Sequence, residues 1–144
     1  MKATGRQRTR RIARRALLQV LYEVDSSGHT VEESLGWVTE QLSLGEESMV
    51  FIKAIANGVL QHRQDLDGEI RRYAPTWPVP QLPAVDRNIL RIAIYEILIS
   101  QETPPKVAVN EAVELAKQFG GENLPSFVNG VLGAVMQTAT SEKT

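Results

Sequence analysis

The sequence lacks residues on which several common protein functions depend. None of its 144 residues is a cysteine, which excludes disulfide frameworks and thiolate chemistry and fits a reducing compartment. It has only two histidines, His29 and His62, and neither stands near a plausible nucleophile or a second metal ligand. We therefore predict a protein that is not an enzyme and that needs neither a metal nor another cofactor.

Long hydrophobic runs are also missing. The basic N-terminus is not followed by the apolar core of a signal peptide, because Gln19 and Glu23 interrupt the first apolar stretch. The most apolar segment, residues 89–99, contains Arg91 and Glu96 and is too short to span a bilayer. We expect a soluble, cytoplasmic protein that does not enter a membrane.

Apolar residues recur every three to four positions along nearly the whole chain, and no alternating pattern of a strand is evident. The first predicted helix begins after Thr9. It ends at the sequence DSSG, residues 25–28, because these residues compete with helical hydrogen bonding. Thr30 and Glu33 have the spacing of a capping box, which predicts the start of a second helix.

Ser43 and Glu46 repeat the capping-box spacing and predict the start of a further helical region that runs to Tyr73. That region is either one long helix or two helices joined near His62. Four of the seven prolines fall within residues 75–83, where no helix can continue. We expect this segment to separate two halves of the chain.

The second half repeats the helical pattern. Pro83 suits the first turn of a helix whose residues are apolar on nearly all sides, which predicts a central, buried element. Pro105 begins the next helix, which ends at Gly120, and Pro125 begins the last. After Met136 the chain is polar, and we expect it to fray.

These elements add up to an all-α fold of two packed three-helix bundles with six to seven helices. We expect one domain over residues 1–144, divided as follows: a basic arm (1–9), a first helical half (10–74), a proline-rich connection (75–83), a second helical half (84–137) and a tail (138–144).

Charge is distributed unevenly. The first fifteen residues hold seven of the sixteen basic residues and no acid, whereas the rest holds nine basic and seventeen acidic residues. The basic residues of this N-terminal stretch are Lys2, Arg6, Arg8, Arg10, Arg11, Arg14 and Arg15. A basic arm on an acidic body indicates a binding tail for an anionic partner.

On a helical wheel, Arg10 and Arg14 border the apolar stripe, while Arg11 and Arg15 point outward on the side of Tyr22. Guanidinium groups bind phosphate with a bidentate fork, and a tyrosine ring can stack on an unpaired base. The pattern therefore favours RNA over duplex DNA. The alternatives are a solubilising terminus, an arm that pairs with acids of its own body, and a Tyr22 that packs in the core.

Four segments carry a resemblance to a known family. They are RRIARRALLQVLYE at 10–23, LRIAIYEI at 90–97, KVAVNEAVELAK at 106–117 and FVNGVL at 127–132. Together they resemble the NusB family of bacterial transcription antitermination factors, and the match extends over nearly the whole chain.

The resemblance implies an RNA-binding protein that is not an enzyme. Members of this family bind the single-stranded boxA element of nascent ribosomal RNA leaders together with NusE, a small-subunit ribosomal protein. The complex helps RNA polymerase pass terminators and aids rRNA maturation. The family fold is a pair of three-helix bundles.

The resemblance also implies site residues. The arm arginines and Tyr22 match the family's RNA-binding first helix, and Asn123 and Phe127 match an RNA-contacting edge. Asn123 stands where many relatives have Asp, and Pro125-Ser126 replaces a pair that usually includes Lys. Phe127 is alternatively the first core residue of the last helix. Asp86 and Arg87 match an edge that relatives use for NusE.

Two other functions fit the same sequence. Some rRNA cytosine methyltransferases begin with a NusB-like RNA-binding domain, and a protein-only helical adaptor would need no nucleic acid. The sequence fits a monomer or a homodimer, because some members form dimers that mask the arm.

Overall fold

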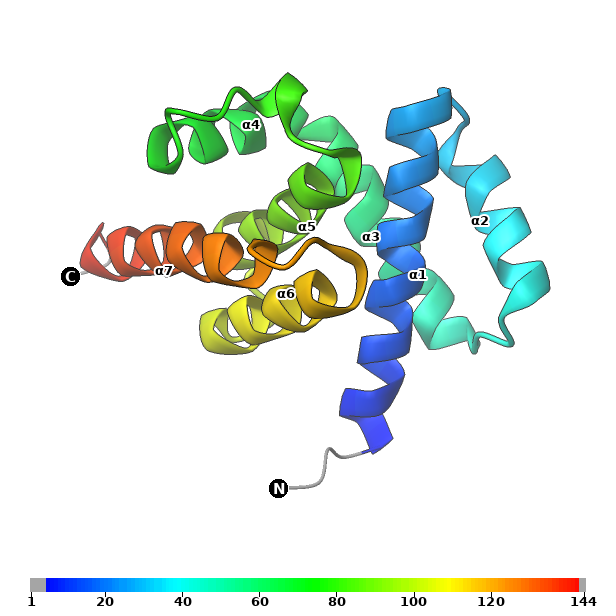
Figure 1. Cartoon of the computed structure of the whole chain (residues 1–144). Coiled ribbons are helices and arrows are strands. Elements are labelled where there is room, and N and C mark those ends of the chain that lie inside the picture. The colour runs from blue at the N-terminus through cyan, green and yellow to red at the C-terminus, as the bar shows by residue number, and fades with distance from the viewer. Residues whose placement is uncertain (1–4, 143–144) are drawn as a thin grey trace. The chain divides into compact units, whose positions relative to one another are not determined.

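The computed structural model describes residues 5–142, and every regular element within that range is helical (Figure 1). Within it, seven α-helices follow one another: α1 (Gly5–Ser27), α2 (Val31–Gln41), α3 (Glu46–Gln61), α4 (Arg63–Tyr73), α5 (Ala84–Tyr95), α6 (Pro105–Phe119) and α7 (Leu124–Glu142). A 3₁₀ turn, η1 (Val79–Gln81), precedes α5, and a π-helical turn, η2 (Glu96–Ser100), continues it. The predictions of an all-α fold and of its helix number are confirmed.

The chain forms two compact units that divide between Leu60 and Gln61. Helices α1 to α3 make up the first unit, and α4 to α7 the second. The proline-rich segment, which the sequence suggests as a boundary, therefore lies inside the second unit. Helix α4 belongs there because it packs on α5 and α7 and buries Leu66 and Ile70.

In the first unit, α1 packs on α2 along a stripe of buried residues at helical spacing that includes Leu17 and Leu21. Helix α1 begins at Gly5, earlier than predicted, and the Thr9 hydroxyl donates to the Gly5 carbonyl one turn before it. Its predicted end is confirmed. Gly28 follows with a φ of +76°, a conformation that glycine adopts without strain.

The two predicted capping boxes have different outcomes. At α2 the Thr30 hydroxyl accepts from the Glu33 amide, and the Glu33 carboxylate accepts from the Thr30 amide, both at 3.1 Å. The prediction at Ser43 is wrong. The Gly45 carbonyl accepts the first hydrogen bond of α3, from the Met49 amide, so Gly45 occupies the cap position.

The region from Glu46 to Tyr73 is two helices, because His62 has a non-helical backbone (φ −104°, ψ 16°). In the second unit, α5 is the central helix: every residue from Asn88 to Ile94 is buried. Helices α6 and α7 run side by side (Figure 1). Pro83 stands at the N-cap of α5, one position before the predicted helical turn.

The connection from α6 to α7 is close-packed. Helix α6 ends at Gly120, as predicted, where a Cβ atom would collide with Leu124 Cδ2 unless the Leu124 side chain moved. Helix α7 then continues beyond Met136 to Glu142, because the polar end of the chain contains no helix breaker and Thr140 donates to the Met136 carbonyl. No helix in residues 5–142 is long and apolar enough to cross a membrane.

Candidate nucleic-acid interface

Helix α1 presents an exposed row of cationic and aromatic side chains. Arg8, Arg11, Arg15 and Tyr22 are spaced three, four and seven residues apart, which places them on one face of the helix. All four are exposed, and Tyr22 is 42% exposed. Tyr22 is therefore not a core residue. The row extends about 21 Å along the helix axis at 1.5 Å per residue.

Two predicted arm residues face the interior of the first unit instead. The Arg10 guanidinium lies 4.0 Å from the centre of the Phe51 ring of α3, and the Arg14 guanidinium lies 5.3 Å from it. Arg10 also lies 3.7 Å from the Glu47 carboxylate. The wheel places both arginines at the border of the apolar stripe, but Arg14 is only 4% exposed. It is buried because the aromatic face attracts a guanidinium and covers its apolar stem.

The remaining predicted arm residues are Arg6 and Lys2. Arg6 is exposed and lines a shallow hollow of about 330 Å³ with Arg10 and Ser48. It lies on the opposite side of α1 from the exposed row, since the step from Arg6 to Arg8 is about 200° around the helix. Lys2 lies outside the described residues.

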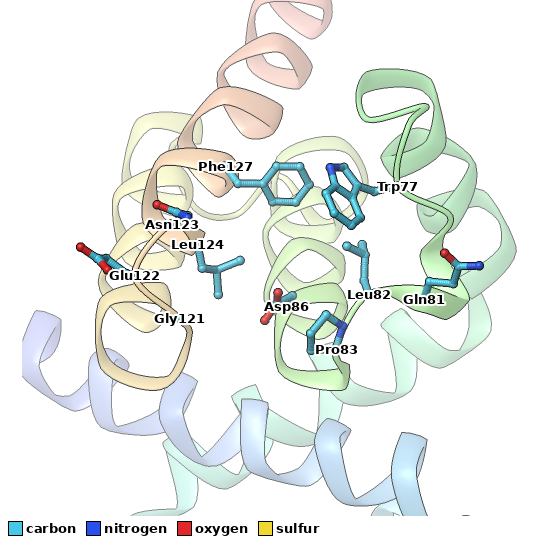
Figure 2. Close-up of a pocket in the computed structure, with 10 residues that line it drawn as sticks. All are labelled: Trp77, Gln81, Leu82, Pro83, Asp86, Gly121, Glu122, Asn123, Leu124 and Phe127. Atoms are coloured by element: carbon cyan, nitrogen blue, oxygen red, sulfur yellow. The ribbon is translucent and has the colours of Figure 1, made fainter.

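The second unit contains a pocket of about 470 Å³ that brings several predicted residues together (Figure 2). Its lining includes Asp86 from α5 with Asn123 and Phe127 from the start of α7. Two RNA-binding predictions and one partner-binding prediction thus meet at a single site. Phe127 is half-buried, so its ring is neither fully exposed to solvent nor fully buried in the core.

Sequence reasoning missed the opposite wall of this pocket. Trp77, from the proline-rich segment, is 56% exposed and lines the pocket, while Leu82 and Leu124 supply buried apolar surface. The tryptophan between two prolines, in the sequence PTWP, was the available signal, because binding residues are often found on exposed loops.

Asp86 and Arg87 are adjacent in α5 but have different surroundings. Burial raises the pKa of the Asp86 carboxyl above its ordinary value, and a hydrogen bond from its own backbone opposes this in part. The Arg87 guanidinium donates to the carbonyls of Pro80 and Leu82, at 3.3 and 3.1 Å. Arg87 therefore supports the chain segment that carries the pocket wall.

Each histidine lies beside an aromatic ring. His29 lies 3.4 Å from the Glu23 carboxylate and packs edge-on against Trp37, with ring centres 4.8 Å apart. His62 lies near the Tyr95 ring. Within residues 5–142, no group of three or more potential ligands could hold a metal ion.

Comparison with known proteins gives one consistent result. The model of the NusB family matches residues 11–137. The transcription antitermination protein NusB of Dehalococcoides mccartyi (strain CBDB1) is 48% identical over 127 residues, 88% of this chain and 89% of that protein.

Solved structures agree with the sequence comparison. A NusB structure from T. maritima is 30% identical, covers 99% of this chain and 98% of its own, and has a TM-score of 0.84. A structure of the antitermination factors NusB and NusE in complex with dsRNA is 26% identical, covers 91% of this chain and 98% of its own, and has a TM-score of 0.82. The chain belongs to the NusB family.

Proposed function

We propose that this protein is a transcription antitermination factor that binds RNA through α1. The observation that carries the proposal is the exposed row of Arg8, Arg11, Arg15 and Tyr22 on α1. The first fifteen residues of the chain contain no acidic residue. The guanidinium groups bind phosphates, and the tyrosine ring stacks on an unpaired base. This combination suits a single strand, whose bases are accessible for stacking.

The proposed RNA is a boxA-like single-stranded element of nascent rRNA, and the proposed protein partner is NusE. A NusB relative in complex with NusE and dsRNA supports the pairing of these partners. For NusE we propose the start of α5, where Asp86 and Arg87 lie. The assembled complex would act on RNA polymerase in the cytoplasm and aid rRNA maturation.

The salt dependence of RNA binding tests the role of α1. For a single strand, log K falls with log salt by about 0.7 for each phosphate contact. The exposed arginines of the row are Arg8, Arg11 and Arg15. If each neutralises one phosphate, the slope for a boxA-like strand is about −2.

Single substitutions then separate the two kinds of contact. Arg15→Ala is expected to flatten the slope by about 0.7, whereas Tyr22→Ala costs about 1–3 kcal/mol of binding free energy at nearly constant slope. The control is Lys106→Ala, which removes an exposed cation of the second unit. It is expected to leave the slope and the binding free energy unchanged. Gel-shift titrations with and without NusE provide the measurement. An affinity for RNA that does not depend on salt would contradict the proposal.

A further inference from the structure

Helix α3 shows how this protein holds an arginine side chain. Glu47 and Phe51 are four residues apart, so their side chains lie on the same face of α3. The Arg10 guanidinium of α1 lies 4.0 Å from the centre of the Phe51 ring and 3.7 Å from the Glu47 carboxylate. A guanidinium suits this pair because its flat face packs on an aromatic ring while the N–H groups at its edge point to a carboxylate.

Helix α2 carries the same two kinds of residue at the same spacing. Glu33 and Trp37 are four residues apart, and Glu40 follows Trp37 by three, so the three side chains share one face of α2. Trp37 is 45% exposed, and both glutamates are exposed as well. Within residues 5–142, no cation lies over the Trp37 ring. The α2 face therefore presents the groups that hold Arg10 on α3, but the described part of the chain supplies no arginine to them.

The Trp37 ring and the Glu33 carboxylate are both held in place. The His29 ring packs against Trp37, with ring centres 4.8 Å apart. The Glu33 carboxylate accepts from the Thr30 amide, and it can accept further hydrogen bonds because it has two oxygens. Hydrogen bonds from the Thr30 backbone and then its side chain lower the pKa of Glu33, so this carboxyl is charged at neutral pH. Fixed groups lower the ordering cost of binding.

The charge around this face is opposite to that of the N-terminal stretch. Residues 1–15 contain seven basic residues and no acid, whereas residues 16–52 contain seven acids and neither lysine nor arginine. Those acids are Glu23, Asp25, Glu32, Glu33, Glu40, Glu46 and Glu47. Such a surface attracts a basic segment of a protein and repels the phosphates of RNA.

We propose that the α2 face formed by Glu33, Trp37 and Glu40 binds an arginine-rich segment of a protein partner, with one guanidinium over the Trp37 ring. This contact goes beyond the proposed function, because the RNA-binding row lies on α1 and does not include these residues. Arginine fits better than lysine, since a guanidinium stacks on the ring and donates to a carboxylate at the same time, whereas an ammonium group is a point charge.

Tryptophan fluorescence tests whether a guanidinium reaches Trp37. The chain has two tryptophans, so Trp77→Phe leaves Trp37 as the only one. The probes are two synthetic dodecapeptides of equal charge, in which either arginine or lysine alternates with serine. We expect the arginine peptide to change Trp37 emission in a saturable way and to bind about threefold tighter than the lysine peptide. Emission that stays constant throughout the titration, or equal affinity for the two peptides, would overturn the proposal.

Substitutions on α2 identify the groups that bind. Trp37→Leu keeps an apolar side chain but removes the flat ring, and Glu33→Gln removes a charge while glutamine can still complete the capping box. Each is expected to weaken binding of the arginine peptide about 2- to 5-fold, measured by calorimetric titration. The matched control is Glu102→Gln, an exposed acid of the second unit, which should leave the affinity unchanged. If Glu33→Gln lowers the melting temperature, Glu40→Gln repeats the test without touching the cap.

Three outcomes overturn the α2 proposal and leave the RNA-binding proposal standing. In the first, Trp37→Leu and the α2 glutamine variants bind the arginine peptide as tightly as the unsubstituted protein. In the second, Glu102→Gln weakens binding as much as Glu33→Gln, which indicates general attraction between opposite charges. In the third, the unsubstituted protein sediments as a dimer that Trp37→Leu dissociates, which assigns the face to a second copy of the chain.

The two proposals can also fail separately. Arg15→Ala should weaken RNA binding and leave binding of the arginine peptide unchanged, whereas Trp37→Leu should do the reverse. If Trp37→Leu weakens RNA binding instead, the α2 face belongs to the RNA and the proposal of a protein partner is wrong.

Discussion

The two units hold their buried arginines in different ways. In the first unit Arg14 packs over the Phe51 ring, which Arg10 approaches to 4.0 Å. In the second unit Arg91 makes a bidentate pair with Asp67, at 2.7 Å and 3.0 Å. An aromatic face attracts a cation without bringing a negative charge, whereas a carboxylate neutralises it. In the first unit Glu47 also lies 3.7 Å from Arg10, so the cationic surface of α1 is carried by the exposed Arg8, Arg11 and Arg15.

The units also begin their helices differently. In the first unit, α2 starts with a reciprocal capping box of Thr30 and Glu33. In the second unit, Pro83 and Pro104 stand at the N-caps of α5 and α6, and neither cap uses a side-chain hydrogen bond. A side-chain cap is lost when the residue that carries its hydroxyl is replaced. A helix that begins at a proline depends instead on the fixed φ angle of that proline.

The largest expected effect concerns the carboxylate that holds a buried cation. Asp67→Ala leaves Arg91, which is 5% exposed, without its bidentate partner. We expect a loss of about 3 kcal/mol in the free energy of unfolding, measured by urea denaturation. The control is Asp65→Ala, an exposed acid of the same helix, which should change stability by less than about 0.5 kcal/mol. Equal effects of the two substitutions would show that the pair of Arg91 with Asp67 does not stabilise the second unit.

Arg14 and Arg15 are neighbours with opposite expected behaviour. Arg14→Ala should destabilise the protein by about 1–2 kcal/mol, because the buried stem and its interaction with the Phe51 ring are lost. Arg15→Ala should leave the melting temperature nearly unchanged, since Arg15 is exposed. Thermal unfolding of both variants, read beside their RNA salt slopes, provides the measurement. If Arg14→Ala were as stable as the unsubstituted protein but had a flatter salt dependence of RNA binding, Arg14 would contact RNA and would not stabilise the fold.

Removing the side-chain cap of α2 should have a moderate effect. Thr30→Ala removes the hydroxyl that accepts from the Glu33 amide, and about 1 kcal/mol of stability is expected to be lost. Thr39→Ala, within the same helix, is the comparison, because Thr39 donates only to the Gly36 carbonyl one turn earlier. Chemical denaturation of the two variants tests whether the cap carries the difference.

The smallest effect is a pH dependence that differs in sign between the units. Hydrogen bonds from the Thr30 backbone and then its side chain lower the pKa of Glu33 below its ordinary 4.5, so its contribution to stability is present above that pH and is lost on acidification. Burial raises the pKa of Asp86 above 3.8, so its charged form costs stability as pH rises.

Stability curves of two isosteric variants check these signs. The advantage of the unsubstituted protein over Glu33→Gln should shrink below about pH 4.5, in the region where that carboxylate takes up its proton. Asp86→Asn should gain stability over the unsubstituted protein as pH rises from about 3 to 7. Parallel curves for both variants would mean that neither carboxylate is coupled to folding.

Much of the fold was predictable because it depends on local patterns. The helical spacing, the capping box at Thr30 and the glycine end of α6 each follow from a few adjacent residues. The same capping signature failed at Ser43, because Leu44 donates to the Leu42 carbonyl in a turn and the helix begins after Gly45. The identity of two residues in a motif does not determine the backbone conformation of the residues between them.

The site was less predictable because its walls come from distant segments. The wheel placed Arg11, Arg15 and Tyr22 on one exposed face, but it could not show that Phe51 of another helix receives Arg14. Nor does any local pattern bring Trp77 to Phe127 across a pocket. Packing between helices determines both arrangements, and the residue spacing within a single segment does not predict that packing.

The close approach at Gly120 has an evolutionary consequence. A Cβ atom at Gly120 would collide with Leu124, which lines the pocket, whereas nothing lies within 4 Å of one at Gly121. During divergence, Gly121 can be exchanged for other residues with little steric penalty, whereas a residue with a Cβ atom at Gly120 requires the Leu124 side chain to move and so changes the pocket that it lines.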